Sequence, residues 1–98
     1  MVQINWTYQA RDDLKLIADY IANDSKRYAR LQVERIKTRT RILKTQPETG
    51  KIVPEINKID IRELVLGNYR IIYKIVSQKQ IDILTIHHSA RDLTTRNI

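Results

Sequence analysis

The stretch Thr85–Asp92, with the sequence TIHHSARD, contains two histidines, a serine, an arginine and an aspartate. Hydrolase triads and ribonuclease sites use these residue types as nucleophile, general acid or base, and phosphate ligand. If this stretch ends a β-strand, successive side chains alternate between two faces, so His87 and His88 point in opposite directions. The two rings then cannot readily bind one metal ion, and no third ligand is near in sequence. We therefore expect neither a metal nor another cofactor.

A serine triad built from Ser89, a histidine and Asp92 is also disfavoured. No nucleophile-elbow motif surrounds the serine, and neighbours in sequence do not have triad geometry. Two interpretations remain for the histidines. One histidine is a half-buried strand-end residue with a hydrogen bond, whereas the other could serve as a general acid, because the unperturbed histidine pKa is close to neutrality.

The positive charge of this 98-residue chain is concentrated in one segment. Between positions 26 and 44, Glu34 is the single acidic residue, and the segment alone carries the formal net charge of the whole chain, +7. Such a field attracts nucleic acid, an acidic peptide or an acidic protein surface, although a solvated helix face is an equal alternative. The basic residues are Lys26, Arg27, Arg30, Arg35, Lys37, Arg39, Arg41 and Lys44.

Length and composition predict a single domain over residues 1–98. The absence of cysteine excludes a disulfide framework and thiolate metal sites. Apolar runs are far shorter than the roughly 18 residues of a membrane span, and residues 1–10 lack the apolar core of a signal peptide. We therefore expect a cytoplasmic protein without a membrane partner.

Hydrophobic periodicity predicts a short strand and two helices in the first half of the chain. Val2–Trp6 alternates, and Thr7 can cap a helix whose apolar residues recur at helical spacing. Asp24 or Ser25 caps a second helix, which ends before Pro47. Gln46–Glu55 contains both prolines and one of the two glycines, so we expect a crossing loop there. The helices share one apolar seam as an αα-hairpin.

The second half predicts three consecutive strands, Asp60–Leu66, Tyr69–Val76 and Ile81–His87, joined as an antiparallel meander. In the middle strand Tyr69, Ile71 and Tyr73 share a face that the helices can cover, while Arg70 projects from the open end of the other face. The order is β-α-α-β-β-β. The predicted fold class is α+β, with an αα-hairpin packed on a small antiparallel sheet.

Several motifs resemble the RelE/ParE superfamily, the toxins of bacterial type II toxin–antitoxin modules. They are DLKLIADYIANDS (13–25), TGKIVPE (49–55), REL (62–64), GNYRIIY (67–73) and HHSARDL (87–93), and the resemblance runs from about Trp6 to Leu93. It implies the same αα-hairpin and antiparallel sheet. It also implies a cognate antitoxin as partner, with operator DNA bound only through the toxin–antitoxin complex.

The superfamily contains two chemistries. RelE-like members cut ribosome-bound mRNA, whereas ParE-like members bind DNA gyrase and trap its cleavage complex. In the nucleases the sheet arginine, here Arg70, steadies phosphate; alternatively, Arg70 pairs with a sheet carboxylate such as Glu63 or Asp82. Arg62 on the neighbouring strand would add to the positive electrostatic potential around Arg70.

Three features favour the gyrase-binding branch and a non-enzymatic toxin. Asp60 and Glu63 lie on the strand where nucleases carry lysines, the tail contains no late tyrosine, and the two histidines alternate faces. The alternatives are an mRNA endonuclease using Arg70, His88 and Arg91, and an inactive antitoxin-binding domain. For binding a target or antitoxin, the predicted residues are Arg35, Arg39, Arg41, Arg62, Arg70 and Arg91.

Overall fold

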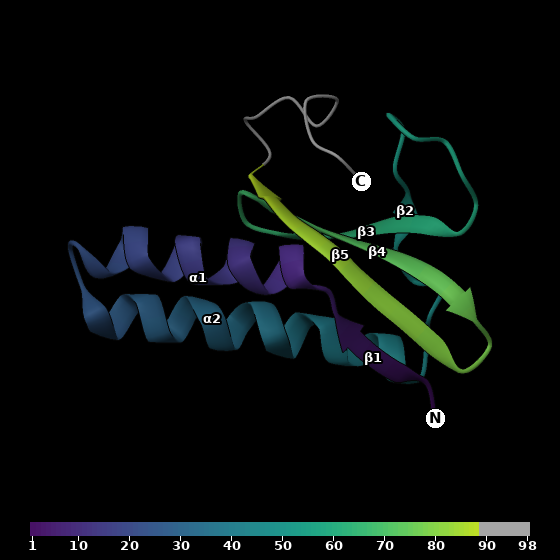
Figure 1. Ribbon diagram of the computed structural model, residues 1–98, viewed down its shortest axis with the longest axis horizontal. Helices are drawn as coiled ribbons and strands as arrows, with labels where there is room; N and C mark the ends of the chain where they lie inside the picture. The colour runs from purple at the N-terminus through teal and green to yellow at the C-terminus, as the bar shows by residue number, and fades with distance from the viewer. Residues whose placement is uncertain (89–98) are drawn as a thin grey trace.

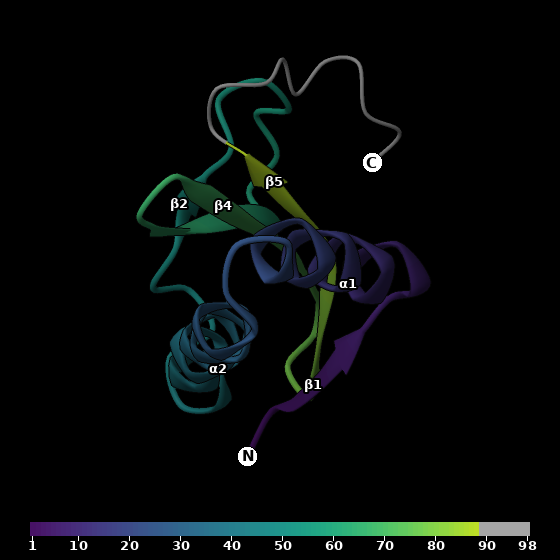
Figure 2. The same cartoon turned by 90° about the vertical axis from the view of Figure 1, so that its left-hand side faces the viewer.

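The computed structural model describes residues 1–88 and has the predicted α+β architecture (Figure 1). Two antiparallel helices pack on one face of a five-stranded sheet, as the end-on view in Figure 2 also shows. Within residues 1–88, no helix is long and apolar enough to cross a membrane. The elements are β1 (Gln3–Trp6), α1 (Tyr8–Ala22), α2 (Lys26–Thr40), the short 3₁₀ helix η1 (Arg41–Lys44), β2 (Lys51–Ile52), β3 (Ile61–Leu66), β4 (Tyr69–Ser77) and β5 (Gln80–His88).

The sheet has the strand order β1-β5-β4-β3-β2. The antiparallel meander β3-β4-β5 is confirmed. β1 pairs with β5 in parallel, so the sheet is mixed rather than wholly antiparallel. The predicted crossing loop contains the two-residue strand β2, which pairs with β3 at the opposite edge. Two residues between turns are too few to show the alternation by which strands are recognised.

Both helices begin at the predicted capping residues. The Thr7 hydroxyl accepts a hydrogen bond from the Ala10 N–H, and the Ser25 hydroxyl accepts one from the Tyr28 N–H. Each bond satisfies an N–H that has no acceptor within its own helix. The predicted seam is confirmed at its centre, because Leu14 of α1 and Ile36 of α2 are buried in the main core.

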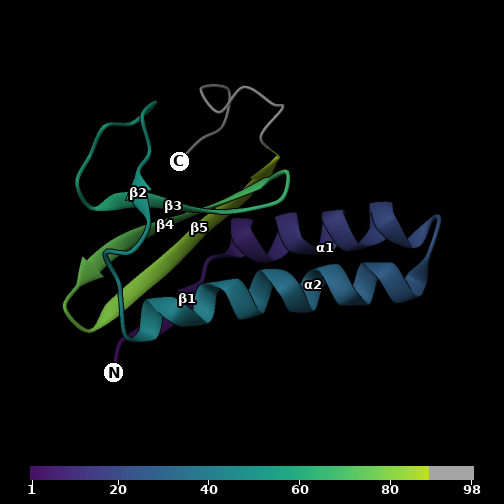
Figure 3. The same ribbon diagram turned by 180° about the vertical axis from the view of Figure 1, so that it is seen from behind.

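The sheet buries apolar side chains on both faces. The helix-covered face includes Leu64, Ile71 and Tyr73, and this confirms the predicted inner face of the middle strand. A second, smaller core contains Val53, Ile61 and Ile72, with Ile56 and Leu84 packed against it. The expectation that this second face is left open at its ends is therefore wrong for the region beneath residues 53–60. The chain between β2 and β3 covers it, on the side away from the helices (Figure 3).

Candidate functional site

Arg70 on β4 is held between two carboxylates. Its Nε donates to Oε1 of Glu63 at 3.1 Å, and its Nη2 donates to Oε2 of the same residue at 2.6 Å. Its terminal nitrogens donate to Glu55, from Nη1 to Oε2 at 2.6 Å and from Nη2 to Oε1 at 2.8 Å. Glu63 thus binds the Nε and Nη2 side of the guanidinium, and Glu55 binds its Nη1 and Nη2 end.

The two carboxylates differ in their surroundings. Glu63 belongs to β3 and is 5% exposed, whereas the Glu55 side chain, on the loop after β2, retains 31% exposure. Hydrogen bonds from Arg70 lower the pKa of Glu55 from 4.5 to about 2. The hydrogen bonds that Arg70 donates to Glu55 and Glu63 in turn raise the pKa of Arg70 above its ordinary value. Of the two carboxylates predicted as ion-pair partners, Glu63 is confirmed. Asp82 instead accepts hydrogen bonds from the side chains of Asn5 and Gln80.

Arg62 does not share this cluster. It precedes Glu63 on β3 and pairs with Tyr73, so its side chain leaves the opposite face of the sheet from Arg70. Its guanidinium donates to the backbone carbonyls of Ile59, at 3.0 Å, and Gly50, at 3.0 Å. Arg62 thereby ties the segments on both sides of β2 to β3.

The two histidines lie on opposite faces, as the alternation predicts. His88 pairs with Tyr69 across β4 and β5, and the two rings meet edge to face with centroids 5.5 Å apart. His87 lies opposite Arg70 in the register of β4 and β5, and it is 1% exposed. Arg70 and His88 of the predicted nuclease set are therefore not brought together, whereas His87 is on the Arg70 face. Ser89, Arg91 and Asp92 lie outside the described residues.

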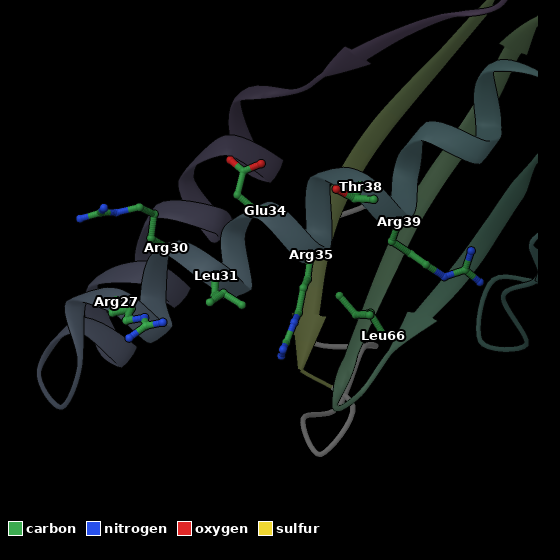
Figure 4. A pocket seen from close by; sticks show the side chains of 8 residues that line it. All are labelled: Arg27, Arg30, Leu31, Glu34, Arg35, Thr38, Arg39 and Leu66. Carbon is green, nitrogen blue, oxygen red and sulfur yellow. The ribbon is translucent and has the colours of Figure 1, made fainter.

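A hollow of about 550 Å³ lies along α2 beside the end of β3, and we call it the basic groove (Figure 4). Two of the predicted binding residues, Arg35 and Arg39, line it, and Leu31 and Leu66 supply an apolar floor. Arg39 also donates from Nε to the Val65 carbonyl at 3.4 Å, which draws α2 toward β3. The lining residues are Arg27, Arg30, Leu31, Glu34, Arg35, Thr38, Arg39 and Leu66.

The groove continues toward the β3–β4 turn. A neighbouring hollow of about 380 Å³ shares Arg35 and Leu66 and adds Tyr28 and Tyr69. The predicted residue Arg41 lies on η1, is exposed, and does not line either hollow. Leu66 was missed from the sequence because it reads as an ordinary strand-end residue. Its position against α2 depends on how the hairpin packs on the sheet.

The arrangement offers charge and apolar surface, with no cluster of metal ligands in the described part of the chain. Among residues 1–88, no group of three or more histidine, cysteine, aspartate or glutamate residues is placed to hold a metal ion. The basic groove combines arginines with leucines, which suits an amphipathic acidic segment of a protein. The Arg70 cluster is internally paired, so it adds no net positive charge to the surface.

Comparisons with known proteins all find toxins or toxin–antitoxin systems. The sequence profile described as "ParE toxin of type II toxin-antitoxin system, parDE" matches residues 4–93. The chain is 34% identical to "Toxin RelE2" of Caulobacter vibrioides over 91 residues, which cover 93% of this chain and 99% of that protein. A solved structure described as "Chromosomal ParDE TA system from P. aeruginosa" superposes with a TM-score of 0.74 at 25% identity. The superposition covers 90% of this chain and 96% of the other.

Proposed function

The chain belongs to the ParE toxin family of type II toxin–antitoxin systems, and from that premise we propose that it inhibits DNA gyrase in the cytoplasm by binding the enzyme. As a toxin of this class it has a cognate antitoxin. Contact with operator DNA is expected only through the toxin–antitoxin complex. In this proposal the chain acts as a ligand of gyrase and does not catalyse a reaction.

One observation carries the choice of gyrase over mRNA. Arg70, which a nuclease of this superfamily would direct at a phosphate, has hydrogen bonds to Glu55 and Glu63 on two edges. Two carboxylates beside one guanidinium leave a net negative charge, which repels RNA. His88 lies on the other face of the sheet from Arg70. Each general acid or base contributes about 10²–10⁴-fold to the rate of such a reaction. Because Arg70 and His88 are on opposite faces, they cannot act together on one phosphate, and this supports a binding toxin better than a nuclease.

The basic groove is the surface that we propose for the antitoxin. Its arginines would attract acidic side chains and speed encounter, while Leu31 and Leu66 would hold apolar anchors of the bound segment. Leu31 remains 41% exposed in the free chain, so a partner that covers it gains apolar burial. A partly disordered antitoxin that becomes ordered as it wraps the hairpin fits this elongated hollow.

The proposed target is tested with purified protein in two parallel reactions. One contains gyrase and supercoiled plasmid, and the other contains translating ribosomes and a defined mRNA. We expect gyrase-dependent linear DNA that disappears when the antitoxin is added, and intact mRNA. Ribosome-dependent mRNA cleavage without any effect on gyrase would refute the proposal.

The alternative target is ribosome-bound mRNA. A specific observation supports it, because the similar Caulobacter protein carries the name RelE2. Loss of mRNA cleavage in a His88→Ala variant would assign this function and the general acid together. If neither reaction responds while the chain still binds its antitoxin, the third candidate, an inactive antitoxin-binding domain, accounts for the fold.

A further inference from the structure

We propose that the outward edge of Arg70 is an exchangeable carboxylate site, which Glu55 occupies in the free protein and which an acidic side chain of a protein partner can take over. This inference goes beyond the proposed gyrase target and does not depend on it. It adds a second contact for an acidic partner, distinct from the basic groove.

The geometry divides the guanidinium into a fixed edge and an open edge. Glu63 takes the Nε and Nη2 side, and it lies within β3, where its backbone pairs with both Lys51 and Ile72. Glu63 is nearly inaccessible at 5% exposure, so it cannot leave without disturbing the sheet. It therefore positions Arg70. The Nη1 and Nη2 edge points away from Glu63, toward the loop.

Glu55 is the member of the cluster that can leave. Its side chain is 31% exposed, and it follows Pro54 in a turn closed by the hydrogen bonds of the Ile56 and Asn57 N–H groups to the Val53 carbonyl. The apolar contacts of this turn with the sheet are made by Val53 and Ile56, which pack in the second core. Rotation of the Glu55 side chain would therefore uncover Arg70 without exposing Val53 or Ile56.

Geometry favours a carboxylate over the phosphodiesters of a nucleic acid as the incoming group. A partner's glutamate or aspartate would replace Glu55 with the same charge and the same planar, bidentate fit to the two terminal nitrogens. A nucleic acid would bring several phosphates toward Glu63 and the displaced Glu55, both negatively charged. An acidic side chain of a protein is thus the occupant that conserves both the charge of the cluster and the planar contact that Glu55 makes.

The first test is chemical rescue of a Glu55→Ala variant. Its Tm is measured in sodium acetate, sodium phosphate and sodium chloride at matched ionic strength. We expect the variant to have a lower Tm than the wild-type chain and acetate to restore about half or more of the loss relative to chloride. In the wild-type chain, where Glu55 fills the site, acetate should give no such increase in Tm over chloride. The same holds for Glu55→Ala/Arg70→Lys, because lysine lacks the two parallel N–H donors of the guanidinium.

The second test measures exchange with a peptide. A fluorescent hexaglutamate peptide is titrated into Glu55→Gln and into Glu48→Gln. The second variant makes the same change in charge at an exposed loop residue that is not among the hydrogen-bond partners of Arg70. We expect Glu55→Gln to bind about tenfold more tightly, as one charge-assisted bidentate contact would allow. The double variant Glu55→Gln/Arg70→Lys should lose that gain.

The outcomes separate this proposal from its alternatives. Equal effects of acetate and chloride, or equal peptide affinity of Glu55→Gln and Glu48→Gln, would overturn it. Rescue by phosphate without rescue by acetate would also overturn it and point to nucleic acid instead. Neither test contains gyrase or ribosomes, so failure here is distinguishable from failure of the proposed target.

Discussion

The carboxylate of Asp13 on α1 accepts hydrogen bonds from the Thr85 hydroxyl and, at 3.1 Å, from the backbone N–H of Ile86 on β5. β1 pairs with β5 only as far as Ile83. Beyond that point, Asp13 of α1 supplies the acceptor for the N–H of Ile86 at the edge of β5. Asp13 is 8% exposed. A buried carboxylate thus joins the hairpin to the sheet, at a point where the β4–β5 register is also irregular.

This relationship predicts that Asp13→Ala destabilises the fold. The substitution removes the acceptor of two buried donors, and leaving such a donor unsatisfied costs about 1–3 kcal/mol. Chemical denaturation should show a loss of at least that size. Asp12→Ala, at an exposed position on the same helix, is the matched control and should change the free energy of unfolding by less than about 0.5 kcal/mol. Equal effects of the two substitutions would contradict the proposed role of Asp13.

The second prediction concerns the close approach of Gly50 to the sheet. A Cβ atom at this position would lie 2.6 Å from both the Glu63 carbonyl oxygen and the Tyr73 hydroxyl oxygen. That hydroxyl accepts a hydrogen bond from the Gly50 N–H at 3.0 Å. Gly50→Ala should therefore lower the free energy of unfolding by about 1–3 kcal/mol, through overpacking against backbone.

Gly67 provides the control for that substitution. It has a positive φ of 55°, but nothing lies within 4 Å of the position that its Cβ would take. Asparagine tolerates this backbone region better than most residues, so Gly67→Asn should cost less than about 1 kcal/mol. If both variants lose stability equally in thermal or chemical unfolding, crowding against Glu63 and Tyr73 does not account for the Gly50 effect.

The sequence predicts those parts of the fold that depend on local pattern. Periodicity predicted the helices and the meander, and Thr7 and Ser25 were recognisable as caps because an N-cap needs only a hydroxyl at the right offset. The parallel pairing of β1 with β5 was not predictable in this way. It joins segments about 77 residues apart, and no local signal specifies the partner of a four-residue strand.

The same distinction applies to the candidate site. The basic charge of residues 26–44 was evident, but the groove also needs Leu66, which tertiary packing places against α2. For Arg70, the sequence proposed Glu63 because neighbouring strands place residues of one face together. It did not propose Glu55, since a loop residue 15 positions from Arg70 follows no strand or helix period.

The third prediction is an acid-dependent loss of stability from the Glu55–Arg70 pair. The folded-state pKa of Glu55 is lowered from 4.5 to about 2, so the folded state favours the ionised form. This contribution is fully present above pH 4.5 and is lost as the pH falls toward 2. The wild-type chain should be more stable than Glu55→Gln at pH 7, and the difference should shrink between pH 4.5 and 2. Denaturant unfolding at several pH values measures it, and a constant difference would contradict the assigned pairing.

The fourth prediction tests the basic groove with the cognate antitoxin. Reversing Arg35 and Arg39 to glutamate removes positive charge from the groove lining and should slow association about tenfold or more at low salt, with a weaker dependence on salt. Arg41→Glu, outside the groove, should have a smaller effect per charge. Stopped-flow association at several salt concentrations provides the measurement. An unchanged on-rate at low salt would exclude the groove as the antitoxin surface.

The last prediction concerns Arg70 itself, because loss of its charge must be separated from loss of the fold. Arg70→Ala leaves Glu63 buried without its cationic partner, and breaking a buried pair in this way costs about 3–5 kcal/mol. Arg70→Ala/Glu63→Gln removes the uncompensated charge and should regain a large part of that stability. Growth arrest on induction is then compared at equal soluble protein. A double variant that is stable and still toxic would show that Arg70 supports the fold, whereas a stable and non-toxic one would assign Arg70 to the target surface.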